Sequence, residues 1–203
     1  MVLKSDLQKA LNGEKNLRGV NLGSADLSNV DLRDANLSKA NLSDANLAGA
    51  DLRGADLQKA DLRGANLNKA NLCEADLEKS NLFQADFKGT ILENANLSFA
   101  NMGFITNVHL AKLSSAILIG ADFRGADLSN VDLSAANLFG ANFYDVDLRG
   151  ADFQDCELSN AIFIRADLRG ANLVNAIIEH ADFTDALRTG ATMPDGRAYR
   201  VNR

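Results

Sequence analysis

The stretch ANLSKANLSDANLAGADLRGADLQKADLRGANLNKANL, from Ala35 to Leu72, repeats Ala, then Asn or Asp, then Leu, then two variable residues, every five positions. Five residues turn an α-helix by about 500°, so successive leucines would spiral around the axis without forming an apolar stripe. On a straight strand, an odd period sends leucines such as Leu37 and Leu42 to alternate faces. Neither a helix nor a straight strand therefore buries these leucines together.

A chain that turns one corner per repeat, always in the same sense, resolves this conflict. Within a repeat, strand alternation places the Ala and the Leu two positions later on the same face, so both point inward. We expect the Asn and Asp side chains at the corners, where they bond nearby backbone groups, and glycines such as Gly54 to ease tight bends. The sequence thus predicts a coil with an interior of Ala and Leu.

The phenylalanines indicate how many repeats make one coil. In the second half, the inward position is Phe at intervals of twenty residues, with Phe153 outside the series. The members of the series are Phe123, Phe143, Phe163 and Phe183. Twenty residues are four pentapeptides, so we expect a roughly square coil in which these rings stack as a core ladder, one coil apart at about 4.8 Å.

The A(N/D)LXX pattern resembles the pentapeptide-repeat family, and it extends from NLRGV at Asn16 to ATM ending at Met193. The resemblance implies an all-β fold, a right-handed quadrilateral β-helix with four pentapeptides per coil. Members of that family include proteins that bind DNA gyrase by imitating DNA and others linked to bacterial development or photosynthetic physiology. Several members dimerise through their C-terminal ends.

One irregularity interrupts the period. The central residue of the repeat advances in steps of five from Leu17 to Met102 and resumes one residue late at Val108. The extra residue falls among 103–105, and two interpretations stay open: a bulge or short loop, or a junction between two arrays of 18 repeats each. Together the repeats predict about nine coils and a tube about 43 Å long.

The repeat array needs covered ends, since a solenoid has two open apolar ends. Residues 1–14 predict a capping helix with Ser5 as N-cap, Gln8 completing a capping box and Gly13 after the last turn, placing Leu7, Ala10 and Leu11 on the first coil. The β-helix then covers 15–193, with the register slip near 103–107, and 194–203 form a tail.

At the C-terminal end, Arg188 takes a core position and the turn signal MPDG follows at 193–196. Two interpretations stay open here. Either Tyr199 and Val201 fold over the last coil, or that coil pairs with a second copy of the chain.

Residues that could perform chemistry are sparse. We expect His109 and His180 on the surface about seventy residues apart, Cys156 as a small core filler and Cys73 facing out. The many Asp residues recur because the motif requires Asn or Asp, so they do not indicate a catalytic carboxylate pair. The sequence predicts no enzyme, cofactor or metal site.

Charge limits the classes of partner. The chain of 203 residues has 27 acidic and 21 basic residues, a net charge of −6, which argues against direct nucleic-acid binding. Residues 1–104 carry a net charge of −2 and residues 105–203 carry −4, which is weak for imitation of DNA over the whole length. No long apolar run follows Lys4, so we expect no signal peptide, no membrane association and a cytoplasmic protein.

The outer surface offers the remaining signal. With faces kept in line across the slip, seven apolar residues at outward positions gather on two adjacent faces near the middle of the tube, and we call them the apolar band. They are Phe83, Phe99, Phe104, Ile119, Phe139, Tyr144 and Ile164. Such a patch indicates contact with a protein partner or a second copy, although the side chains would also cover one another or the bulge. A non-catalytic scaffold for an unidentified protein partner is the favoured function, with DNA-mimicking modulation of gyrase or another type II topoisomerase as the alternative.

Overall fold

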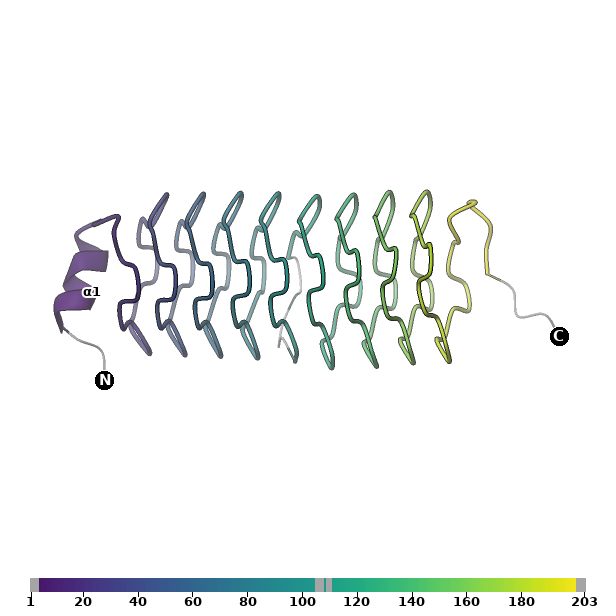
Figure 1. Ribbon diagram of the computed structural model, residues 1–203, viewed down its shortest axis with the longest axis horizontal. Helices are drawn as coiled ribbons and strands as arrows, with labels where there is room; N and C mark the ends of the chain where they lie inside the picture. Colours follow the sequence, from purple (N-terminus) through teal and green to yellow (C-terminus); the bar gives the residue numbers. More distant parts are fainter. Residues whose placement is uncertain (1–3, 105–107, 109–110, 200–203) are drawn as a thin grey trace.

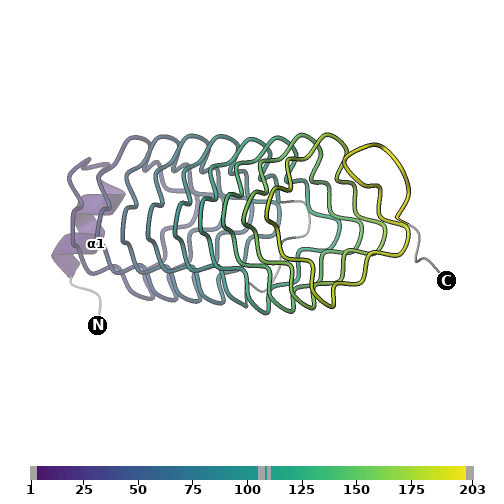
Figure 2. The same ribbon diagram turned by 45° about the vertical axis from the view of Figure 1, so that its right-hand side comes forward.

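The computed structural model describes residues 4–104, 108 and 111–199. It begins with one short helix, α1 (Lys4–Leu11), after which the chain winds repeatedly around one long axis (Figure 1). The helix lies at one end of this rod and the C-terminal residues at the other, and an oblique view shows the successive turns stacked as a tube (Figure 2). The described part of the chain has no helix that is long and apolar enough to span a membrane.

Parallel β-bridges hold each turn of the tube to the next. Asn16 bridges to Asn36, and Asn36 bridges to Asp56, so bridged partners lie twenty residues apart and one turn contains four pentapeptides. Two backbone hydrogen bonds make up the bridge between Asn36 and Asp56: the Leu37 N–H donates to the Asp56 carbonyl (2.7 Å) and the Asp56 N–H donates to the Ala35 carbonyl (3.0 Å). Each repeat is therefore bonded to one coil before it and one coil after it.

The corners lie at the two variable residues of the repeat. In the repeat that starts at Ala35, the Ala40 N–H donates to the Leu37 carbonyl (2.9 Å) and Lys39 has φ 60°, as in a type II turn. Asn36 lies on the flat side, in the bridge, and its Oδ1 accepts a hydrogen bond from the Ser38 N–H (3.1 Å). The prediction of Asn and Asp at the corners is wrong, because these side chains brace the turn from the position before the leucine.

The interior is filled by the Ala and Leu of each repeat; Ala35 and Leu37, for example, are 1% and 0% exposed. In the second half the ring of Phe143 stacks on Phe123 (centroids 5.0 Å apart) and on Phe163 (4.9 Å), and Phe163 stacks on Phe183 (4.8 Å). Phe153 meets Phe143 edge to face at 5.8 Å. Phe183 is only partly buried, since it lies in the last coil.

The extra residue changes the period without rotating the faces. Bridges across the slip join residues 21 apart, as in Ile91 with Lys112 and Asn101 with Asp122, and each pair stays on one face. Phe104 has φ 51° and its N–H donates to the Arg124 carbonyl (3.1 Å), so residues 103 and 104 form a regular turn. The extra residue lies between Phe104 and Val108, a stretch that includes Ile105 and falls outside the described residues.

Helix α1 covers the first coil, with two differences from the sequence prediction. The helix begins at Lys4, so Ser5 lies within its first turn, and the Gln8 Nε2 donates to Asn12 Oδ1 (2.8 Å) instead of closing a capping box. Ala10 is fully buried, but Leu11 is 49% exposed and does not join the core. The end of the helix is a Schellman turn, in which the N–H of Gly13 donates to the Ala10 carbonyl at 3.1 Å.

Asp6 on this helix closes the open edge of the first coil. In later coils the N–H at the Asn position donates to a carbonyl of the preceding coil, and Asn21 has no preceding coil. Its N–H donates instead to the Asp6 carboxylate (3.0 Å). The helix thus supplies both apolar cover and a hydrogen-bond acceptor.

At the other end, the tail turns back over the last coil. Thr192 and Ala198 form an antiparallel bridge, and the Tyr199 N–H donates to the Ala191 carbonyl (2.7 Å). The guanidinium of Arg188 lies between two rings, 5.2 Å from the centroid of Phe183 and 4.3 Å from that of Tyr199. Tyr199 therefore covers this end in part, while Val201 lies outside the described residues.

Candidate interaction surface

The apolar band is distributed over two adjacent faces of the tube. The first face carries Leu97 and Leu118 inside, and there the Phe99 N–H donates to the Ile119 carbonyl (2.8 Å). The second face carries Met102 and Phe123 inside, and on it the rings of Phe83 and Phe104 meet edge to face with centroids 5.7 Å apart. The turns that present these side chains are the regular corners of the coil.

The band residues differ in exposure. Four of them are exposed: Phe99 (56%), Phe104 (55%), Phe139 (45%) and Tyr144 (39%). Phe83, Ile119 and Ile164 are half-buried. The band is therefore an accessible surface and not only a set of side chains that cover one another.

Ile117 belongs to the same surface and was missed by the sequence analysis. It is 40% exposed and occupies the Asn or Asp position of the first face, bridged to Asn96 and Asn137. Outward apolar residues were predicted only at the two variable positions after each leucine. An Ile at the position where the motif requires Asn or Asp was the signal that would have found it.

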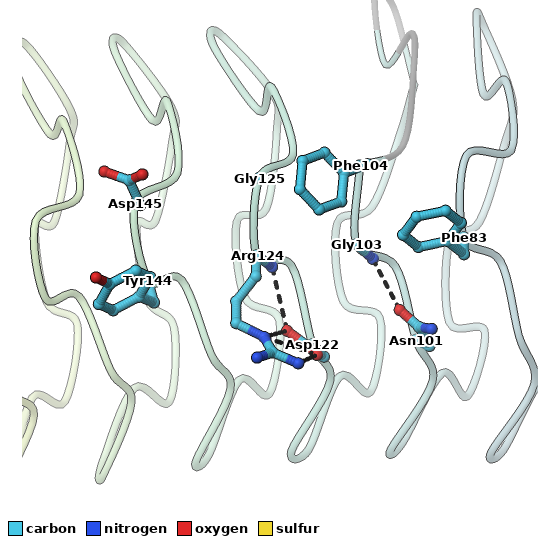
Figure 3. Close-up of a pocket in the computed structure, with 9 residues that line it drawn as sticks. All are labelled: Phe83, Asn101, Gly103, Phe104, Asp122, Arg124, Gly125, Tyr144 and Asp145. Atoms are coloured by element: carbon cyan, nitrogen blue, oxygen red, sulfur yellow. Dashed lines mark hydrogen bonds and ion pairs between the residues drawn. The ribbon is translucent and has the colours of Figure 1, made fainter.

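A hollow of about 480 Å³ opens on the second face within the band (Figure 3). Residues from four successive coils surround it, with rings on several sides and Gly103 between them. The lining residues are Phe83, Asn101, Gly103, Phe104, Asp122, Arg124, Gly125, Tyr144 and Asp145. The hollow exists because the 20-residue wrap aligns a glycine with large side chains on the coils before and after it.

The charged groups at the hollow are paired with one another. The Arg124 Nε and Nη2 donate to Asp122 Oδ1 (2.9 Å) and Oδ2 (2.6 Å), and Arg165 Nη2 lies 3.2 Å from Asp145 Oδ1. Partial burial by itself raises the pKa of Asp122, but the hydrogen bonds from Arg124 outweigh burial and leave the pKa lowered. Asp122 is therefore held as an anion beside the Arg124 guanidinium at neutral pH.

The Asp122 and Arg124 pair is one of a series of local clamps along the tube. In each clamp, the Nε and Nη2 groups of an Arg donate to the carboxylate of the Asp two residues earlier, which lies at the bridge position. The other pairs are Asp31 with Arg33, Asp51 with Arg53, Asp61 with Arg63, Asp147 with Arg149, and Asp167 with Arg169. Each clamp neutralises a carboxylate in place and weakens the negative potential of the surface.

The residues considered for chemistry do not come together. His180 is exposed, and His109 lies outside the described residues. Cys73 and Cys156 are both free thiols; Cys73 is half-buried and Cys156 is buried in an Ala position, where its Sγ donates to the Leu133 carbonyl (2.9 Å). Among the described residues, no group of three or more His, Cys, Asp or Glu side chains is placed to hold a metal ion.

Exposed apolar residues also occur near the C-terminal end. Ile177 is 49% exposed and Leu187 is 53% exposed, both at Asn or Asp positions. They lie on separate repeats outside the apolar band. The tail leaves them uncovered, so this end keeps some apolar surface despite the contact between Tyr199 and Arg188.

The repeats of this chain match the sequence profile of a known protein family. The profile of a family described as Pentapeptide repeats matches eight copies, over residues 16–54, 40–78, 50–89, 80–103, 116–155 and 151–187. No curated protein sequence shows significant similarity to the chain.

Several solved structures are similar to this chain. HetL from Nostoc sp. strain PCC 7120, a pentapeptide repeat protein involved in heterocyst differentiation regulation, is 33% identical over 98% of this chain and 100% of its own, with a TM-score of 0.44. A second Nostoc pentapeptide repeat protein, alr5209, is 38% identical over 55% of this chain and 86% of its own, with a TM-score of 0.44. QnrB1, a plasmid-mediated fluoroquinolone resistance protein, is 20% identical over 72% of this chain and 86% of its own, with a TM-score of 0.44.

Proposed function

The chain belongs to the pentapeptide-repeat family, and from this premise we propose that it is a non-catalytic scaffold whose rigid outer surface binds a protein partner in the cytoplasm. In this proposal the rod is a right-handed quadrilateral β-helix of about nine coils, in which α1 caps the first coil. The apolar band is the contact surface. Its partner is a protein and not a nucleic acid or a membrane.

One observation carries the proposal: exposed aromatic side chains are concentrated at the middle of the rod. Phe99, Phe104 and Phe139 each leave 45% or more of their surface in water. Exposed aromatic clusters of this kind are typical of protein interfaces, where their burial supplies most of the binding energy. The stacked coils beneath them form a stiff support, which favours binding with little loss of conformational entropy.

The experiment compares wild-type protein with Phe104→Asp/Phe139→Asp. Photo-crosslinking groups placed at Ile117 and Tyr144 report contacts made in cells, and sedimentation velocity reports self-association. We expect the double variant to lose the crosslinked species, because two charges would be buried in an apolar contact. Unchanged crosslinking and unchanged sedimentation would contradict the proposal.

A matched control is available elsewhere on the rod. Asn94→Asp/Asn130→Asp adds the same charge at exposed turn positions with φ 59° and 57°, on the two faces that lack the band. This variant should retain every interaction of the wild-type protein. Loss of crosslinking in both double variants would indicate a general effect of charge.

Self-association has two candidate surfaces, the apolar band and the last coil. The contact of Tyr199 with Arg188 favours a tail that covers the last coil over end-to-end pairing. A dimer through the band would be lost in Phe104→Asp/Phe139→Asp. A dimer through the C-terminal end would persist in that variant and disappear in Leu187→Asp.

The alternative hypothesis, imitation of DNA at a type II topoisomerase, requires a rod dominated by negative potential. The Asp and Arg clamps oppose it, since they neutralise carboxylates along the rod, as Arg149 does for Asp147 (2.5 Å). We expect no inhibition of DNA gyrase supercoiling at a large molar excess of this protein. Dose-dependent inhibition that weakens on charge reversal of the C-terminal acids would favour mimicry instead.

A further inference from the structure

The hollow on the second face results from one missing side chain in a column of large ones. The first variable position of the repeat is Phe83, Gly103, Arg124 and Tyr144 on four successive coils of this face. Backbone hydrogen bonds keep these coils in register, including Gln84 N–H to the Gly103 carbonyl (3.3 Å). Gly103 is the one position of the four without a side chain.

The backbone does not require glycine at this position. Gly103 is not among the glycines with positive φ, whereas Gly125, one residue further along the turn of the next coil, has φ +70°. Phe83, Arg124 and Tyr144 occupy the same turn position in their own coils. The backbone conformation of residue 103 therefore does not require glycine, although a β-carbon there would lie 3.3 Å from the Arg124 carbonyl oxygen and 3.3 Å from Asn101 Oδ1.

The walls of the hollow are mostly flat groups. The rings of Phe83 and Phe104 meet edge to face on one side, and the guanidinium of Arg124 and the ring of Tyr144 lie on the other (Figure 3). A β-carbon at residue 103 would stand 3.7 Å from Phe83 Cδ2 and 3.3 Å from the Arg124 carbonyl. A group entering above Gly103 would thus lie between Phe83 and Arg124.

The polar atoms of the hollow are already paired. Asn101 Oδ1 accepts from the Gly103 N–H (3.1 Å), and Asn101 Nδ2 donates to Asn81 Oδ1 (3.2 Å). Arg124 uses its Nε and Nη2 edge for Asp122, which leaves the face of its guanidinium plane for stacking. A charged ligand would have to break these pairs, whereas an uncharged ring would not.

The paired charged groups of the hollow are arranged so that they complement an aromatic ring. Such a ring has a negative face, which suits the guanidinium of Arg124, and a positive edge, which suits the carboxylates of Asp122 and Asp145. An aliphatic side chain would fill the same space without these two contacts. The volume of about 480 Å³ is large enough for one aromatic side chain together with part of its backbone.

We propose that the hollow above Gly103 receives one aromatic side chain of the partner protein, which lies between Phe83 and Arg124 and stacks on the guanidinium of Arg124. The inference rests on the proposed function, because it names the chemical group that the apolar band recognises. Pocketed aromatic residues of this kind are typical anchors of protein interfaces.

The test uses two small probes, N-acetyl-L-tryptophan amide and N-acetyl-L-leucine amide, titrated into isotope-labelled full-length protein and followed by NMR. We expect saturable shifts of the Gly103 and Gly125 amide signals with the tryptophan probe, and binding at least tenfold weaker with the leucine probe. Arg124→Gln should weaken binding of the tryptophan probe severalfold while leaving the leucine probe unchanged. Gly103→Phe should abolish the shifts of the Gly125 amide signal.

Ser43→Phe is the matched control, since it adds a ring at the same turn position of the same face, three coils earlier. It should bind the tryptophan probe like wild type, and circular dichroism checks that each variant is folded. Equal binding of both probes, no shifts at Gly103 and Gly125, or full binding by Gly103→Phe would overturn the inference.

The two proposals fail separately. If Phe104→Asp/Phe139→Asp abolishes crosslinking to the partner and Gly103→Phe leaves it intact, the interaction surface stands and the aromatic anchor is wrong. If Gly103→Phe abolishes crosslinking and Ser43→Phe does not, both stand. If neither variant changes crosslinking, the proposed function fails and the anchor inference, which rests on it, fails with it.

Discussion

The ring of Phe104 lies against Gly125 so closely that a β-carbon on residue 125 would stand 2.5 Å from its Cε1 atom. Phe99 has the same relationship with Gly120, where the nearest ring atoms would be 2.8 Å away. In both pairs, the ring belongs to the second variable residue of its repeat and contacts the second variable residue of the repeat one coil later. The exposed rings of the apolar band are thus accommodated by glycines about twenty residues later in the chain.

Replacement of Gly125 by Ala tests this contact. The change combines a left-handed backbone, which costs about 1–2 kcal/mol with a side chain, and a collision with Phe104, which adds about 1–3 kcal/mol. Gly170→Ala is the control, because Gly170 has φ +73° and open space around it. In urea unfolding, Gly125→Ala should lose more stability than Gly170→Ala, and Phe104→Ala in the Gly125→Ala background should remove the difference. Equal losses in the two single variants would show that the ring simply moves aside.

The Phe ladder should contribute unequally along its length. Phe143 is fully buried and stacked on both sides, so Phe143→Ala should cost about 3–5 kcal/mol. Phe183 is partly buried and stacked on one side only, so Phe183→Ala should cost less. Phe143→Leu should have the mildest effect of the changes at residue 143, since Leu is the common residue of the motif. Urea unfolding measures all three, and a greater loss in Phe183→Ala than in Phe143→Ala would contradict the ladder.

Asp6 should hold α1 to the first coil. Its side chain is 13% exposed and accepts the hydrogen bond of the Asn21 N–H, so Asp6→Ala leaves that donor unpaired at a cost of about 1–3 kcal/mol. Hydrogen exchange should accelerate in α1 and the first coil and stay unchanged at the middle of the rod. Glu14→Ala, at an exposed residue after the helix, serves as the control. Uniform acceleration along the rod would indicate global destabilisation instead.

The two thiols should react differently. Burial raises the pKa of the Cys156 thiol to about 12, and burial also raises the pKa of Cys73, although Cys73 is partly accessible. A disulfide reagent at pH 8 should therefore modify one thiol per folded chain, slowly, and two in urea. Cys73→Ser should leave no reactive thiol in the folded protein. Rapid modification of both cysteines in folded wild type would show that the core opens near Cys156.

The Asp and Arg clamps should make stability depend on pH. The side-chain hydrogen bond from Arg63 lowers the pKa of Asp61 from its ordinary value. A carboxylate with a lowered pKa stabilises the fold above its unfolded pKa of about 4, and this contribution disappears as the pH falls through the folded value. The urea concentration at the unfolding midpoint should therefore decrease as the pH is lowered below about 4. This decrease should be smaller in Arg63→Gln than in Lys88→Gln. Parallel pH profiles for the two variants would contradict this role.

Much of the tube was predictable because its constraint is local and repeated many times. The five-residue period requires Ala and Leu on one side of the chain, and the spacing of Phe143 and Phe163 indicates the length of one coil. The same wrap predicted which outward residues share a face, including Phe99 with Phe139. Details at single repeats were less predictable: Asn36 lies on a flat side instead of at a corner, and Leu11 is exposed.

By itself, therefore, the sequence determined the repeat, the inward residues and the columns of the outer surface, because these follow from chain periodicity and burial alone. Only the tertiary structure decided that Gly103 leaves a hollow, that Arg124 turns its charged edge to Asp122, and that Asp6 closes the first coil. These features depend on the directions of side chains from residues one coil apart or at the open ends. No five-residue rule specifies such directions, since each is the result of packing between particular neighbours.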